Sequence, residues 1–167
     1  MNNLLCFSRN RNTSVQTIDD EIIVSTCRMN DTLTDVSVTI TVQLPDLEIK
    51  AAEGSIHHLF EENPTDLSEP LQGVKGVRIG PGMLKIIKGL IGESKDIGEL
   101  IYMVEECCHG VILYFTRDTL LDMPVDKKEA DRYFKKMVKE NIRMYNRCAA
   151  FAPGSPLVEG IEPPSAG

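Results

Sequence analysis

The segment Val36-Ser37-Val38-Thr39-Ile40-Thr41-Val42 decides the fold class of this chain. Apolar and hydroxyl side chains alternate along it with a period of two, and β-branched residues favour the extended backbone of a strand. One face of such a strand packs on a core while the other meets water. Turn-forming pairs, Asn30-Asp31 and Pro45-Asp46, flank it on either side. The sequence therefore predicts an antiparallel sheet of three or four strands, whose clearest members are Ile22–Cys27, Leu33–Leu44 and Leu47–Ala52.

Helical patterns follow the strands, as a sheet with one apolar face requires a cover. Met83–Ile91 is expected to form a short helix, and apolar residues recur at helical spacing from Ile97 to Phe115. Asp96 and Glu99 have the spacing of a capping box for this second, longer helix. The apolar run over residues 111–115 would alternatively form a buried strand.

A second capping box, Asp126 and Glu129, predicts a last helix that reaches about Arg147. The predicted fold class is therefore α+β: an N-terminal antiparallel sheet packed by a C-terminal layer of helices that includes one long central helix.

Composition limits the class of protein. The chain has 167 residues, 42% of them hydrophobic, and we expect one domain over residues 1–151 with a flexible Pro/Gly-rich tail over 152–167. A net charge of −7 argues against DNA binding. The chain also lacks the apolar run of about 20 residues that would predict a membrane helix. The N-terminus lacks the apolar stretch of a secretory signal and the cysteines number five, so we expect a cytoplasmic protein with reduced thiols.

Two histidine-containing clusters are candidates for metal or thiol chemistry. Glu106 and His109 have the Glu-x-x-His spacing of di-metal helix bundles, but the chain has no second copy of this motif. Cys107 and Cys108 precede His109, and their helical positions favour small core residues over ligands. His57 and His58, each with a glutamate four residues later, would add donors if the fold brought them to the cysteines. We expect no cofactor, with a divalent metal on His57, His58, Cys107, Cys108 and His109 as the alternative.

A glycine-rich segment over residues 73–82 is a candidate anion site. Lys75 and Arg78 supply cations, and Gly80 and Gly82 precede a predicted helix whose first amides would face an anion. The segment lacks the Gly-Lys-Ser/Thr ending of a P-loop, and tight turns explain its glycines equally well.

The predicted last helix separates charge from apolar surface. Residues 126–147 contain eight cations and four acids, hence +4, which leaves −11 for the rest of the chain. Such a face is usually solvated, but it would also attract an acidic protein partner or an RNA backbone. The cations of this basic face are Lys128, Arg132, Lys135, Lys136, Lys139, Arg143 and Arg147.

The long helix is apolar on more than one side. Between Ile97 and Phe115, thirteen of nineteen residues are apolar or cysteine, and Tyr102, Met103 and Leu113 fall outside the main stripe. The helix either runs through the centre of the domain or meets a second subunit, and a homo-oligomer formed through it is a reasonable hypothesis.

Several short motifs resemble the bacterial domain-of-unknown-function family 2889 over about residues 9–120. They are the strand end at 42–49, the pair Ala52-Glu53, the segments 71–74 and 79–82, and the stretch from Gly92 to Leu100. Family members carry Gly-Cys-Thr-His-Leu at the start of the long helix, where this chain has Ser94, Lys95, Asp96 and Ile97 in place of Cys, Thr, His and Leu.

A further cysteine of the family, expected near Pro64, is also missing from this chain. The resemblance thus implies a fold and a bacterial cytoplasmic setting without an activity. The expected function is a non-enzymatic binding or accessory module that acts through protein–protein contacts, with a metal- or thiol-dependent enzyme as the alternative.

Overall fold

The computed structural model describes residues 6–80, 82–91, 97–146 and 148–164. Asp96 of the first predicted capping box and Arg147 of the predicted basic face lie outside these residues, as do Ser94 and Lys95. The chain divides into two compact units, Met1–Phe115 and Thr116–Gly167.

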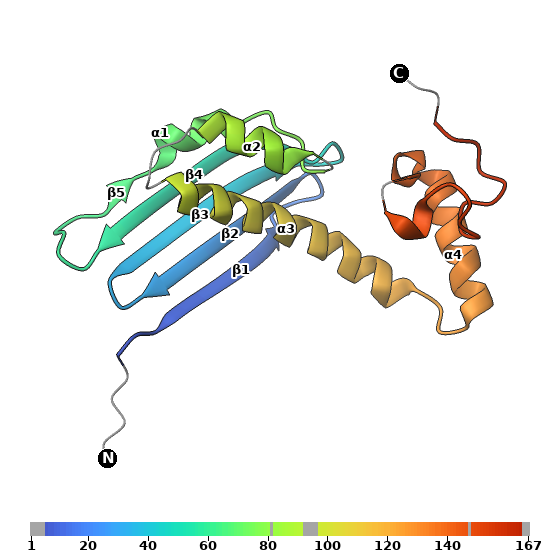
Figure 1. The fold of residues 1–167 in the computed structure, drawn as a ribbon, viewed down its shortest axis with the longest axis horizontal. Coiled ribbons are helices and arrows are strands. Elements are labelled where there is room, and N and C mark those ends of the chain that lie inside the picture. The colour runs from blue at the N-terminus through green and yellow to red at the C-terminus, as the bar shows by residue number, and fades with distance from the viewer. Residues whose placement is uncertain (1–5, 81, 92–96, 147, 165–167) are drawn as a thin grey trace, which may run out of the picture. The chain divides into compact units, whose positions relative to one another are not determined.

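Unit 1 contains a five-stranded antiparallel sheet, and the predicted α+β class is confirmed. The strands follow one another across the sheet in chain order, β1-β2-β3-β4-β5, with each strand antiparallel to the next (Figure 1). The sequence analysis missed the first strand and the last. Their bounds are β1 Arg9–Thr17, β2 Ile22–Asp31, β3 Thr34–Gln43, β4 Glu48–His58 and β5 Thr65–Asp66.

The alternation along β3 produces the two faces that were predicted. Val36, Val38, Ile40 and Val42 are all buried, while the serine and threonines between them are half-buried on the other face. On that second face the hydroxyl groups meet across strands, as in the 3.0 Å contact between Thr26 Oγ1 of β2 and Thr39 Oγ1 of β3. The sheet therefore has one apolar face, which the helices cover, and one face of small polar side chains.

The outer side of β4 is hydrogen-bonded near its start and again over residues 54–56. β5 pairs with Ser55 and Ile56, and the amide of Leu67 donates to the carbonyl of Gly54 at 2.8 Å. Near the start of β4, Ile49 exchanges hydrogen bonds with Gly76 and Val77 at 2.8 and 2.9 Å. The segments that close this edge include two short helices, α1 (Ser68–Leu71) and the 3₁₀ helix η1 (Gln72–Val74).

Two helices cover the apolar face of the sheet (Figure 1). α2 (Met83–Ile91) buries Met83, Ile87 and Ile91. α3 (Ile97–Asp122) is one continuous helix, so the alternative strand over residues 111–115 is wrong. None of the helices in the described ranges combines the length and the apolar character that crossing a bilayer demands.

α3 packs tightly against the sheet at Gly110. A Cβ atom at this position would lie 2.8 Å from Thr13 Cγ2 of β1 and 3.2 Å from Ser25 Oγ of β2. Real Cβ atoms do not come that close to a neighbour, so the absence of a side chain lets the helix backbone rest on these two strands.

Unit 2 has a small core of its own. α4 (Lys127–Glu140) begins at Asp126, whose side chain accepts hydrogen bonds from the amides of Lys128 and Glu129, as the second capping box predicted. The helix ends at Glu140 instead of Arg147 because Asn141 leaves the helical conformation, with φ −127° and ψ 78°. Two 3₁₀ helices follow, η2 (Ile142–Met144) and η3 (Ala149–Phe151). The buried side chains of this core are Val138, Phe151 and Val158, the last from the Pro/Gly-rich segment.

Candidate functional site

Cys107 and Cys108 lie in the core between α3 and the sheet. Both side chains are fully buried, as is that of Cys27 on β2. The Cys107 thiol donates to the carbonyl of Val38 at 3.4 Å, and the Ser25 hydroxyl donates to the carbonyl of Cys107 at 2.9 Å. These contacts give the cysteines the environment of small core residues.

Burial keeps these thiols protonated. It raises the pKa of Cys107 well above its ordinary value, and the neighbouring Cys27 and Cys108 raise it further. Burial, with a smaller effect of the Glu105 carboxylate, raises the pKa of Cys108 to about 12. Burial also raises the pKa of Cys27. Because the thiolate is the nucleophile and the metal ligand, none of the three is chemically prepared for either role at neutral pH.

His109 lies on the side of α3 that faces away from the cysteines. Its side chain is 47% exposed, and its Nδ1 is 3.8 Å from Glu106 Oε1 one turn earlier. The Glu-x-x-His pair therefore stands at the surface of α3, and only its Glu106 carboxylate is near enough to Cys27 to contribute to the rise of that thiol's pKa.

His57 and His58 lie at the end of β4, on the rim of the sheet. Nε2 of His57 is 3.0 Å from the carbonyl of Glu61, and Nδ1 of His58 is 3.4 Å from Thr34 Oγ1. Among the residues that the structure describes, no three His, Cys, Asp or Glu side chains form a group able to hold a metal ion. The structure thus does not bring the predicted metal-binding residues together.

The glycine-rich segment closes the edge of the sheet. Val74, Val77 and Ile79 are buried, and Lys75 and Arg78 point to solvent between them. Arg78 Nη1 lies 3.9 Å from Asp46 Oδ1, so a carboxylate already occupies its surroundings.

The two candidate glycines of this segment serve the backbone. The amide of Gly80 is 3.4 Å from Met83 Sδ, and Gly82, with φ +86°, supplies the carbonyl that accepts from the first turn of α2. An anion site on these four residues stays a prediction.

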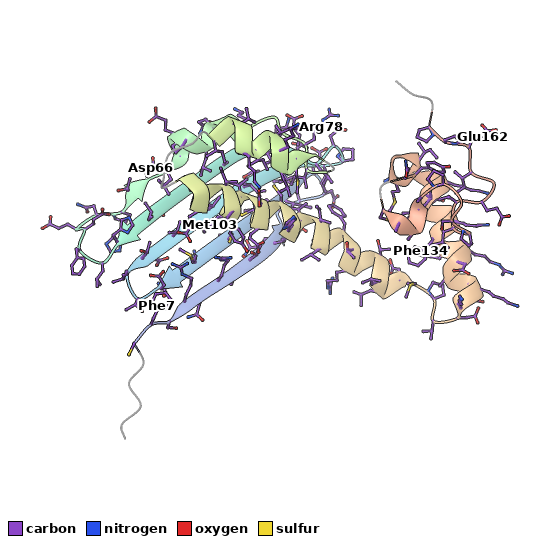
Figure 2. All side chains as sticks on the ribbon, in the orientation of Figure 1. Phe7, Asp66, Arg78, Met103, Phe134 and Glu162 are labelled. Carbon is purple, nitrogen blue, oxygen red and sulfur yellow. The ribbon has the colours of Figure 1, made fainter. Side chains whose placement is uncertain are left out.

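The basic face of α4 is at the surface of unit 2. Phe134 packs against Phe151 with ring centroids 6.3 Å apart, and Figure 2 shows Phe134 directed toward the turns of the same unit. The opposite side carries the five predicted cations that lie within α4, whereas Arg143 belongs to η2, beyond the end of the helix. Lys128, Arg132, Lys136 and Lys139 are exposed and Lys135 is half-buried. Lys136 forms an i,i+4 ion pair with Glu140 at 3.7 Å.

A hollow of about 400 Å³ lies among the C-terminal turns of unit 2. Tyr145, Pro156, Val158 and Glu159 are among its lining residues. The hydroxyl of Ser155, which also lines it, donates to the carbonyl of Ala150 at 2.5 Å and accepts from the amide of Leu157 at 3.2 Å. The hollow is therefore a packing feature of the C-terminal turns.

The surface that the sequence analysis missed is the outer edge of β1. β1 pairs with β2 over nine consecutive residues, and within the described part of the chain no other strand pairs with it. Its side chains are exposed except for Val15, which is half-buried. The alternation of β-branched residues at Thr13, Val15 and Thr17 was the one local signal for this strand.

Side chains of β1 on the helix-covered face are held by α3. The guanidinium of Arg11 lies 4.1 Å from the ring centroid of Tyr102, and Thr17 Oγ1 donates to the hydroxyl of Tyr114 at 3.2 Å. Arg9 is 3.8 Å from Glu99 and forms a 2.6 Å ion pair with Asp31 of β2. Met103 falls outside the main apolar stripe of the long helix, yet it is fully buried. Figure 2 shows it between α3 and the sheet.

Comparisons with protein-family models, curated proteins and solved structures find no match to this chain. The resemblance to the bacterial family 2889 therefore stays a prediction.

Proposed function

We propose that this chain is a non-enzymatic binding module whose unit 1 joins another chain by strand addition at the outer edge of β1. The observation that carries the proposal is the difference between the two edges of the sheet. β4 is bonded on its outer side by β5, Leu67 and the segment 76–79, whereas no strand among the described residues pairs with the outer edge of the nine-residue β1. Strand addition uses such an edge, because main-chain amides and carbonyls supply the affinity.

The chemistry of the cysteines and histidines supports a binding role over catalysis. The three core thiols are buried with raised pKa values, and the histidines stand at the surface on β4 and on α3. None of the five cysteines, all in described residues, forms a disulfide, which suits the reducing cytoplasm of a bacterium.

Site-specific photo-crosslinking in bacterial cells tests the proposed edge. A benzoylphenylalanine in place of Asn12, exposed on β1, should give an adduct of defined mass, because a strand added to this edge passes directly beside it. The same group in place of Glu53, exposed on β4 inside the sheet, is the matched control and should give none. No adduct from position 12, or equal adducts from both positions, would contradict the proposed edge.

Metal and thiol measurements test the enzymatic alternative. The purified protein should contain far less than one metal ion per chain, and Cys27, Cys107 and Cys108 should react with a thiol reagent only after unfolding. Stoichiometric metal, or a core thiol that reacts at neutral pH in the folded protein, would favour a metal- or thiol-dependent enzyme using Cys107, Cys108 and His109 with His57 or His58.

A second candidate function is the binding of an RNA backbone by α4. It rests on the separation of α4 into an apolar side packed in the core of unit 2 and a cationic side at the surface. Affinity for single-stranded RNA should fall steeply as salt rises, and Lys136→Glu with Lys139→Glu should abolish it. Lys75→Glu with Lys85→Glu, two exposed lysines of unit 1, is the charge-matched control. An RNA affinity that is independent of salt would contradict this function, as would an unchanged affinity of the α4 variant.

A further inference from the structure

We propose that the chain added to β1 is a second copy of this protein, with the two β1 strands antiparallel and Thr13 at the two-fold axis. The inference rests on the proposed binding edge and names its occupant. In this register all nine residues of β1 find partners, which a shift in either direction would not allow. The product is a continuous sheet across a symmetric dimer, the commonest symmetry among homo-oligomers.

The charges of β1 suit this register. Arg9 faces Thr17 of the second copy and Arg11 faces Val15 of the second copy, so no arginine opposes an arginine. On the open face of the sheet, Asn12 faces Ser14 of the second copy, and Ser14 faces Asn12 of the second copy. Like charges directly opposite one another destabilise an antiparallel pair, and registers centred on Arg9, Asn10 or Arg11 would create such pairs.

The two arginines do not block the edge. Charged side chains at an edge commonly discourage pairing, but both of these side chains are held by their own unit. Arg9 is bound to Asp31 through Nε and Nη2, at 3.0 and 2.6 Å, and Arg11 lies against the ring of Tyr102. The outer backbone of β1 is therefore left open to a partner strand.

Apolar surface on α3 lies beside the same edge. Leu113 is 66% exposed and stands one turn after Gly110, the point at which α3 meets Thr13 and Val15 of β1. A second copy paired through β1 brings its own α3 to the same side of the continuous sheet. Leu113 of each copy then lies on the side of the continuous sheet that carries both α3 helices.

The side chains of β1 favour a second copy over a foreign peptide. Peptides recognised by strand addition are distinguished by pockets for their alternate side chains. The open face of β1 instead presents Asn10, Asn12, Ser14 and Gln16, which are short or uncharged polar groups. In the proposed register these four residues pair only with one another, polar against polar.

A charge exchange on the open face tests both the partner and the register. Asn12→Glu with Ser14→Glu places two glutamates opposite each other twice per dimer, whereas Asn12→Glu with Ser14→Lys places glutamate opposite lysine twice. Within each chain position 12 faces Arg28 of β2 and position 14 faces Thr26. Because both variants carry Asn12→Glu, the effect of this substitution on folding is the same in the two. Sedimentation equilibrium measures the dissociation constant of each.

The wild type should sediment as a concentration-dependent dimer at tens of micromolar. The glutamate–glutamate variant should dissociate at least about tenfold more readily than the glutamate–lysine variant. Hydrogen exchange should show alternate amides of β1 becoming slower as the wild-type dimer forms. A wild type that is monomeric at 100 µM would overturn the inference, and so would equal dissociation constants for the two variants.

The outcome is separable from that of the proposed function. Self-pairing would be refuted if the wild type is monomeric and position 12 gives a cross-link whose mass differs from that of two chains. The proposal that β1 is a binding edge would then still hold. The absence of any cross-link at position 12 would refute both.

Discussion

Replacing Gly110 with alanine tests how α3 packs on the edge of the sheet. The new Cβ atom would lie 2.8 Å from Thr13 Cγ2, and 3.2 Å from both Ser25 Oγ and Val15 Cγ2. Carbon atoms in favourable contact are about 3.5–4.0 Å apart, so the methyl group must push β1 or the helix away by several tenths of an ångström. Overpacking of this kind costs about 1–3 kcal/mol.

The same substitution also has a favourable part. Alanine is preferred over glycine inside a helix by about 1 kcal/mol, so the expected net loss for Gly110→Ala is about 0–2 kcal/mol. Gly89→Ala in α2 isolates the two effects, because a Cβ at position 89 meets no described atom within 4 Å. That variant should gain about 0.5–1 kcal/mol, and the difference between the two variants should equal the overpacking cost.

Urea unfolding followed by the infrared band of the β-sheet measures both variants. The five strands of the sheet all belong to unit 1, as do Gly89 and Gly110, so this signal reports on the unit that was changed. The midpoint should fall for Gly110→Ala and rise for Gly89→Ala at an unchanged slope. Equal gains for the two variants would refute the close approach of α3 to β1.

Three further predictions follow from individual contacts. Ser25→Ala should lower the free energy of unfolding by about 1 kcal/mol, since it removes the buried hydrogen bond from β2 to the carbonyl of Cys107 in α3, as urea unfolding would show. Folding raises the pKa of Cys108 from its ordinary 9.0 to about 12, so stability should be full below pH 9 and fall as the pH rises toward 12, and Cys108→Ala should flatten this slope in alkaline unfolding titrations. Asp126→Ala should cost α4 about 1 kcal/mol in thermal unfolding, because the amides of Lys128 and Glu129 lose their acceptor.

The parts of the fold that the sequence predicted are those with a buried apolar face. β3 was predictable because its valines and isoleucine must alternate to fill one side of a sheet, and α3 because its apolar residues recur with the period of a helix. β1 was not, because an edge strand with eight exposed residues out of nine has little apolar pattern to show. Its strand conformation comes from pairing with β2 and from contacts with α3, which are distant in sequence.

The candidate site shows the same limit. The spacing of Glu106 and His109 correctly placed both on one side of a helix, and the helical pattern placed Cys107 and Cys108 on the core side. Whether His57 and His58 would reach those cysteines depended on where β4 ends relative to α3, which no local pattern encodes. The end of α4 is a related case: the cationic spacing continues past Glu140, but the backbone of Asn141 turns away.

The polar character of β1 determines how its open edge would associate. An apolar edge of nine residues would associate without selectivity, because burial of side chains has no directional preference. In β1 the side chains gain little from burial, so association must draw on main-chain hydrogen bonds, each worth only about 0.5–1.5 kcal/mol net. Such bonds form together only in a register that aligns the whole strand and separates the arginines. A contact with these properties is selective and reversible, which is what a binding module requires of an edge such as that of β1.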